Sequence, residues 1–199
     1  MRKIIITTIT LLVISINNTN AQAVWGGRIG LSHYTETLSA NIEDFSSSNK
    51  AEFFGIELGP VMYYSFTNRL YLNTGATLGI IFPVEDMLRD SYQLFHVDIP
   101  LYLGFSAPIG NNLSLFAQAG PYVGYWTSTD EFTNDILNPF QAGIGLMAGI
   151  NIKRFKFEFG YKHGLTDLSS NEGRWDNEIY ILESSSKLTS LFFGISYVF

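Results

Sequence analysis

Apolar residues alternate with small or polar residues in eight separate segments of this 199-residue chain. The segments cover residues 24–34, 53–66, 70–81, 94–107, 113–126, 140–152, 155–165 and 188–199. In the last segment, LTSLFFGISYVF, Phe193, Ile195 and Tyr197 share one face, and Gly194 and Ser196 lie on the other. A period of two predicts β-strands. Most of the segments exceed the usual soluble strand of about five or six residues and are long enough to cross a bilayer, which takes about 9–11 tilted residues.

The composition indicates a membrane environment. Charged residues make up only 15% of the chain, against about 25% in ordinary globular proteins. Beyond residue 23, no stretch approaches the roughly 18 apolar residues of a membrane helix. A closed barrel is the other structure that satisfies every backbone group in hydrocarbon. A two-sheet sandwich would also alternate, but its solvated face would carry more charge. The sequence therefore predicts an all-β protein, a transmembrane eight-stranded antiparallel up-and-down β-barrel.

The first 21 residues have the features of a cleaved signal peptide. Arg2 and Lys3 supply the positive charge, an apolar stretch covers residues 4–16, and small residues follow. Cleavage after Ala21 is favoured over cleavage after Ala23, which leaves a barrel domain of residues 22–199. Because the chain has no cysteine, no lipid acceptor or disulfide is expected.

The connections between the predicted strands are of two kinds. Three are tight, at residues 67–69, 110–112 and 153–154, and four are long and polar, at 35–52, 83–93, 127–139 and 166–187. Outer-membrane barrels have short periplasmic turns and long extracellular loops, so both chain ends should be periplasmic. Fifteen of the eighteen carboxylates fall in the long loops. Simple solubility explains them, and divalent-cation bridging to lipopolysaccharide is the alternative.

Basic residues are few. Arg69, Lys153, Arg154 and Lys156 are expected to cluster at the rim formed by the short turns. Loss of Arg2 and Lys3 lowers Lys+Arg from 12 to 10 against 18 Asp+Glu, which gives a mature net charge of −8. This balance argues against nucleic-acid binding.

The alternation predicts a polar network inside the barrel. Five charged residues fall on the inward faces of their strands: Arg28, Glu57, Asp98, Glu158 and Lys162. The interior of an eight-stranded barrel is just wide enough to be filled by side chains, and buried charges must be paired. We expect Glu57 and Asp98 to pair with Lys162, and Glu158 with Arg28. A proton or ion path is the alternative role.

Local geometry adds two expectations. Pro60, Pro100 and Pro121 lie inside predicted strands, where their missing N–H groups predict β-bulges. The strand that ends at Phe199 is expected to close the barrel against the first strand, so that no sheet edge is left unpaired.

The segments FGYKHGLTDLSSNEG (159–173) and SLFFGISYVF (190–199) resemble small outer-membrane β-barrels of the OmpA/OmpX type, sometimes called the porin family. The likeness is greatest to the PorT-like barrels of Bacteroidetes. It implies an integral outer-membrane protein of a Gram-negative bacterium and, for PorT itself, a role in protein secretion and gliding. Phe199 resembles the terminal sorting signal that the barrel-assembly machinery recognises; anchoring in an aromatic belt is the simpler alternative.

The histidines do not fit the pattern of a known outer-membrane barrel enzyme. One outer-membrane barrel enzyme, a lipid A deacylase, places His-x-Ser on one strand face. Here residues 163–165 read His-Gly-Leu and residues 33–35 read His-Tyr-Thr, so neither makes a triad. We expect no catalytic residue, no cofactor and no metal site, and His96 is expected to be a lumen histidine.

Together these features predict a monomer in the outer membrane with a structural, binding or secretion-support role carried by long acidic extracellular loops. The alternatives are a narrow porin-like barrel for small or hydrophobic solutes and a lipid A-modifying enzyme. Expected partners are outer-membrane lipid and lipopolysaccharide, the barrel-assembly machinery during insertion, and a secretion-system or cell-surface protein.

Overall fold

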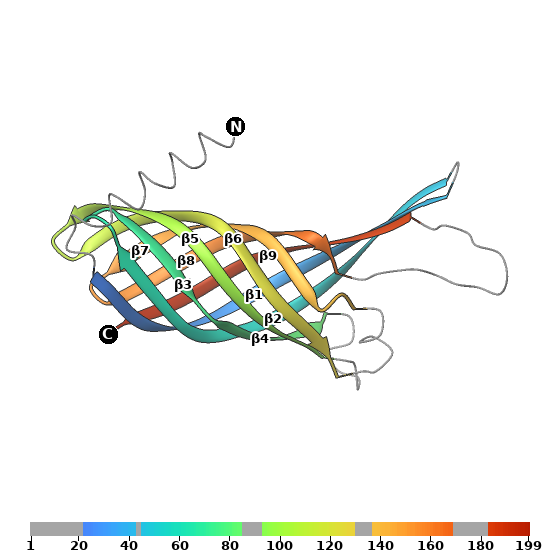
Figure 1. Ribbon diagram of the computed structural model, residues 1–199, viewed down its shortest axis with the longest axis horizontal. Coiled ribbons are helices and arrows are strands. Elements are labelled where there is room, and N and C mark those ends of the chain that lie inside the picture. Colours follow the sequence, from blue (N-terminus) through green and yellow to red (C-terminus); the bar gives the residue numbers. More distant parts are fainter. Residues whose placement is uncertain (1–21, 43–44, 85–92, 130–136, 169–182) are drawn as a thin grey trace, which may run out of the picture.

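The computed structural model describes residues 22–42, 45–84, 93–129, 137–168 and 183–199, which form one closed sheet (Figure 1). Its strands are β1 (Gln22–Ile42), β2 (Phe45–Ser65), β3 (Leu70–Gly75), β4 (Thr77–Pro83), β5 (Leu94–Gly110), β6 (Leu113–Ser128), β7 (Phe140–Ile152), β8 (Phe155–Asp167) and β9 (Glu183–Val198). Among these residues, the structure contains no helix with the length and hydropathy of a membrane span. The predicted signal peptide, residues 1–21, lies outside the described ranges.

The sheet closes into a ring of eight strands. Each strand pairs antiparallel with its neighbours, and β1 pairs with both β2 and β9. β3 and β4 both pair with β2 and β5, and the register of β2 continues unchanged from Val61↔Gly75 to Leu58↔Leu78. They are therefore two parts of one strand, interrupted at Ala76. The predicted eight-stranded antiparallel barrel is confirmed.

The predicted bulges at Pro60, Pro100 and Pro121 are wrong. β2 keeps one register through Pro60, and β5 and β6 keep theirs on both sides of the other two prolines. Between Pro100↔Tyr122 and Leu103↔Ala119 the ladder loses pairs but inserts no residue. A missing N–H donor removes a hydrogen bond without requiring an extra residue, so the ladder is interrupted and not shifted. The register shifts lie instead at Pro108–Gly110 and at His163–Asp167.

The outer surface of the barrel is an apolar band. Leu103, Leu146 and Phe159 point outward with 57–60% of their surface exposed, and other outward positions between the rims are mainly Ile, Leu, Val, Ala and Phe. Within the described strands, no Lys, Arg, Asp or Glu lies on this outward face between the rims. An apolar exterior without charge is the surface that hydrocarbon solvates.

Aromatic side chains border this band at both ends. At the short-turn end, Tyr197 packs against Phe155 with ring centroids 5.1 Å apart. At the long-loop end, Tyr125 and Phe140 pack with centroids 5.4 Å apart. Two such girdles are typical of transmembrane barrels, where aromatic rings lie at the membrane interfaces.

The first hairpin is longer than expected and extends beyond the ring at the long-loop end (Figure 1). Residues 35–52 were predicted to be a loop, but β1 continues to Ile42 and β2 begins at Phe45. β9 begins at Glu183 and pairs with the same part of β1, so three strands extend together. Strands outside the membrane are solvated on both faces, and they lack the apolar alternation that reveals a half-buried strand. The other long loops lie largely outside the described residues.

Candidate functional site

The barrel interior contains an apolar cluster at its long-loop end. Its members are buried side chains from β1, β2, β4, β5, β6 and β9 and from the residues that flank the long loops: Tyr34, Phe53, Ile81, Leu94, Trp126, Leu137, Leu168 and Leu188. The strand residues lie on inward positions, where the alternation places large side chains inside the narrow ring. We call this set the apolar cap.

An ion triad lies next to the cap. The Nζ atom of Lys162 is 3.3 Å from Glu57 Oε2 and 3.3 Å from Asp98 Oδ2. Glu57 also accepts hydrogen bonds from the hydroxyl of Ser32 and, at 2.6 Å, from that of Tyr34. Each charge in the triad therefore has a charged partner, as burial in a ring surrounded by hydrocarbon requires.

Aromatic groups support the triad from the cap. The indole Nε1 of Trp126 donates to Asp98 at 3.3 Å, and the ring of His96 stacks on Trp126 with centroids 4.8 Å apart. The Nδ1 atom of His96 lies 3.4 Å from Asp98 Oδ1. The carboxylate of Asp98 is thus held in place by three different side chains.

A second pair lies deeper in the barrel. Arg28 Nη1 is 4.0 Å from Glu158 Oε2, Nη2 of Arg28 donates to Thr77, and the guanidinium lies 5.3 Å from the ring centroid of Phe192. Glu158 accepts hydrogen bonds from Ser196 at 2.7 Å and Gln118 at 3.4 Å. The Nε and Nη1 atoms of Arg28 are buried without a hydrogen bond in the described part of the chain, so this pair is looser than the triad.

The structure brings together the five charged residues that the sequence placed in the lumen. All five are buried, with 1–5% of their surface exposed, and the ion pairs present are the ones predicted. His96 is also buried, as expected. The hydroxyl of Tyr34 and the indole of Trp126 were not predicted to take part. Both lie on inward positions, but aromatic side chains there are equally compatible with simple packing.

The predicted basic cluster at the short-turn end is present. Arg69, Lys153, Arg154 and Lys156 line one cavity there, and Lys156, only 4% exposed, points into the barrel. The alternation that placed Glu158 inward applies equally to Lys156, two residues earlier on β8.

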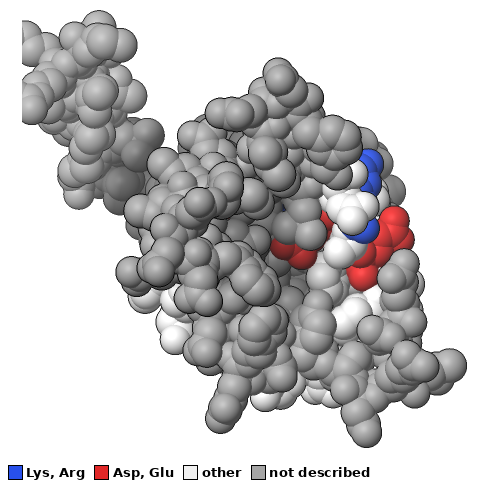
Figure 2. Space-filling view, turned by 90° about the vertical axis from the view of Figure 1, so that its right-hand side faces the viewer, with Lys and Arg blue, Asp and Glu red and all other residues white. Residues whose placement is uncertain are grey.

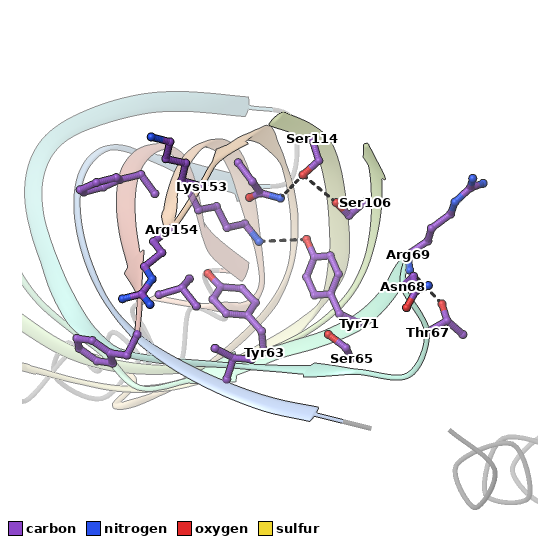
Figure 3. A pocket seen from close by; sticks show the side chains of 16 residues that line it. Tyr63, Ser65, Thr67, Asn68, Arg69, Tyr71, Ser106, Ser114, Lys153 and Arg154 are labelled. Carbon is purple, nitrogen blue, oxygen red and sulfur yellow. Dashed lines mark hydrogen bonds between the residues drawn. The ribbon is translucent and has the colours of Figure 1, made fainter. Parts of the chain in front are cut away.

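A cavity of about 360 Å³ opens at the short-turn end (Figure 3). Its lining includes Tyr63, Tyr71, Lys156 and Phe199. Phe199 is 72% exposed, and its backbone N–H donates to the carbonyl of Trp25 at 2.9 Å. This bond ties residue 199 to β1. The role of Phe199 as an assembly signal stays a prediction.

The histidines considered for catalysis lie at the long-loop end. His33 Nε2 is 3.5 Å from Glu52 Oε2, and both side chains are about half exposed. His163 stacks on Tyr161 with centroids 6.5 Å apart. Among the described residues, no hydroxyl is hydrogen-bonded to His33 or His163, and no group of three or more His, Asp or Glu residues is arranged to hold a metal ion.

The family described as "Outer membrane protein beta-barrel domain" matches residues 15–170. The chain belongs to this family. It is therefore a small outer-membrane β-barrel protein, and the predicted outer-membrane localisation is confirmed. No curated protein matches the chain.

Solved structures of outer-membrane proteins are similar to this chain at low sequence identity. Neisserial surface protein A is 11% identical, with a TM-score of 0.43, over 86% of this chain and 97% of its own. OprG from Pseudomonas aeruginosa is 10% identical, with a TM-score of 0.43, over 87% and 96%. The outer membrane enzyme PagL is 11% identical, with a TM-score of 0.42, over 81% and 97%.

Proposed function

We propose that this protein is a non-conducting outer-membrane barrel that anchors a binding or secretion-support surface at its long-loop, extracellular end. The observation that carries the proposal is the filled interior, in which Lys162 bridges Glu57 and Asp98 beside the apolar cap. A barrel whose lumen is occupied by paired charges and packed rings offers solutes no path, so its activity has to lie at its ends.

The layers of the interior support this proposal over a narrow porin-like barrel. Tyr102, Met147 and Phe192 pack together at 0–1% exposure. The Arg28–Glu158 pair and the ion triad both lie near this cluster: Arg28 is 5.3 Å and Lys162 is 5.8 Å from the centroid of Phe192. A water path along the axis would have to pass these side chains and then the apolar cap. Opening it would break ion pairs that are costly to separate when buried.

The extended hairpin supports a binding role. In Figure 2, which faces the long-loop end, the acidic and basic side chains that can be seen lie mainly on the right-hand side, with some acidic atoms nearer the centre. Glu52 is exposed on β2, and Lys187 Nζ lies 3.1 Å from Asp167 Oδ1 between β9 and β8. A projecting sheet with mixed charge is suited to contact a cell-surface or secretion-system protein. The resemblance to PorT-like barrels points to the same partner class.

We propose that the protein is not an enzyme. Modification of lipid A is therefore the weaker candidate function. His33 has a carboxylate at 3.5 Å but no hydrogen-bonded hydroxyl among the described residues, and a nucleophile-activating arrangement needs both.

Planar-bilayer recording of the purified, heat-modifiable barrel tests the proposal. The expected result is no channel opening above the lipid baseline. Reproducible open-channel currents from the native protein would instead favour the porin-like alternative.

Deleting the outer part of the first hairpin tests whether this hairpin forms the binding surface. Replacing residues 37–50 by Asn-Gly keeps the pair Glu36↔Ala51 and closes the hairpin with a two-residue turn. The shortened protein should insert and fold normally but lose the partners that the native protein captures from intact cells. Unchanged capture would move the binding role away from this hairpin.

A further inference from the structure

The cavity at the short-turn end has an unusual charge. Four cationic side chains line it, Arg69, Lys153, Arg154 and Lys156, and no Asp or Glu side chain is among its lining residues. Arg154 donates to the hydroxyl of Tyr197 at 3.4 Å. Within the described chain, no carboxylate lies within 4.0 Å of any of the four. The cavity therefore gathers four cationic side chains, none of which makes an ion-pair contact in the described part of the chain.

Lys156 lies at the inner end of this cavity and is the most buried of the four. Its Nζ atom donates to the hydroxyl of Tyr71 at 3.1 Å and to Gln118 Oε1 at 3.4 Å; the first bond is the dashed line that ends on the labelled Tyr71 in Figure 3. The same atom lies 3.8 Å from the ring centroid of Phe116 and 4.3 Å from that of Tyr63. An ammonium group has three N–H donors, and the described side chains accept two of them.

The surroundings of Lys156 differ from those of the other buried cations. Lys162 has two carboxylates at 3.3 Å and Arg28 has one at 4.0 Å. The carboxylate nearest to Lys156 along β8, Glu158, is held instead by Ser196 and Arg28. Because a buried charge whose hydrogen-bond partners are all neutral is costly, the position favours an anion supplied from outside.

Tyr63 gives an independent indication of a ligand. Its side chain is buried at 8% exposure, lines the same cavity, and its hydroxyl makes no hydrogen bond of normal geometry in the described part of the chain. Figure 3 shows the rings of Tyr63 and Tyr71 beside each other, and their centroids are 5.9 Å apart. A buried hydroxyl without a partner is a donor available to a bound acceptor.

We propose that this cavity binds an oxyanion, a phosphate or carboxylate group that enters from the short-turn face. Lys156 and the hydroxyl of Tyr63 would contact the anion, and Arg69, Lys153 and Arg154 at the turns would attract it and its attached group. A volume of about 360 Å³ is at the lower end of small-ligand pockets. The site lies at the opposite end from the proposed partner-binding surface and does not depend on it.

Binding can be measured on the folded barrel in zwitterionic detergent. Inorganic phosphate is titrated and followed by phosphorus NMR line broadening, with acetate as competitor. Vesicles of phosphatidylcholine with and without phosphatidylglycerol separate a free solute from a lipid headgroup. Saturable binding in this cavity of phosphate, of acetate or of the phosphatidylglycerol headgroup supports the proposal. Absence of saturable binding to all three overturns it.

Variants of the lining residues test whether the anion binds in this cavity. Lys156→Met should weaken phosphate binding about tenfold or more, because a charge-assisted hydrogen bond is lost. Lys50→Met, an exposed lysine on the hairpin at the other end, is the matched control and should bind as the native protein does. Equal binding by Lys156→Met and the native protein overturns the proposal. If Lys156→Met does not fold, Tyr63→Phe removes one hydroxyl and should weaken binding severalfold; unchanged binding there also overturns it.

Discussion

Lys162 and Glu57 are 105 residues apart in the chain, and their charged groups meet at 3.3 Å inside the barrel. β8 supplies the lysine and β2 the glutamate, and these strands are not neighbours in the ring. The pair therefore crosses the lumen, and Asp98 from β5 joins it from a third direction. Such a contact ties strands that share no backbone hydrogen bond.

Removing the shared cation should destabilise the barrel strongly. Lys162→Met leaves Glu57 and Asp98 buried without their cation, a change that typically costs about 3–5 kcal/mol. The triple variant Lys162→Met, Glu57→Gln, Asp98→Asn removes all three charges and should recover most of the loss. Guanidinium unfolding in lipid vesicles measures both. Lys50→Met is the surface control, and equal stability of Lys162→Met and this control would contradict a structural role for the triad.

Gly79 should not tolerate a side chain. A Cβ atom there would lie 1.9 Å from His96 Nε2, and the histidine is held between Trp126 and Asp98. Overpacking of this kind costs about 1–3 kcal/mol, so Gly79→Ala should lower the unfolding midpoint. Gly27→Ala is the control, because its Cβ would meet no atom within 4 Å. If both variants unfold alike, His96 moves more freely than its contacts indicate.

The free-energy cost of placing a charged side chain on the apolar band should depend on how deep in the bilayer that position lies. Leu146 is the middle residue of β7 and 60% exposed, so Leu146→Lys should cost about 2–4 kcal/mol. Leu165, near the long-loop end of β8 and 57% exposed, should accept lysine at about 0–1 kcal/mol. Unfolding from vesicles measures the difference. Equal costs would show that the hydrocarbon does not lie across the middle of the strands.

Substituting Phe199 tests whether this residue is an assembly signal or an anchor at the membrane interface. As a signal, Phe199→Ser should reduce the folded, heat-modifiable barrel recovered from cell membranes while leaving refolding of the purified protein into detergent unchanged. Phe155→Ser is the control, because Phe155 is also exposed and belongs to the same girdle through Tyr197. If the two variants reduce recovery from cells equally, Phe199 acts as an anchor only.

The sequence alone determined which side chains face the lumen. Successive side chains in a pleated strand point to opposite faces, so the inward positions of Glu57, Asp98 and Lys162 follow from local periodicity. In a ring narrow enough to be filled by side chains, pairing of these opposite charges also followed.

Only the tertiary structure decided how far along the barrel each residue lies and which uncharged side chains surround the buried charges. Lys156 belongs to the same inward face as Glu158, yet only the register of eight strands places it beneath Phe116 and beside Tyr71, without a carboxylate. The strands of residues 35–52 left no periodic alternation of apolar and polar residues in the sequence. The pleat of each strand decides locally which face of the sheet a side chain occupies. Its position along the barrel axis and its neighbours across the lumen depend on strand tilt and register around the closed ring.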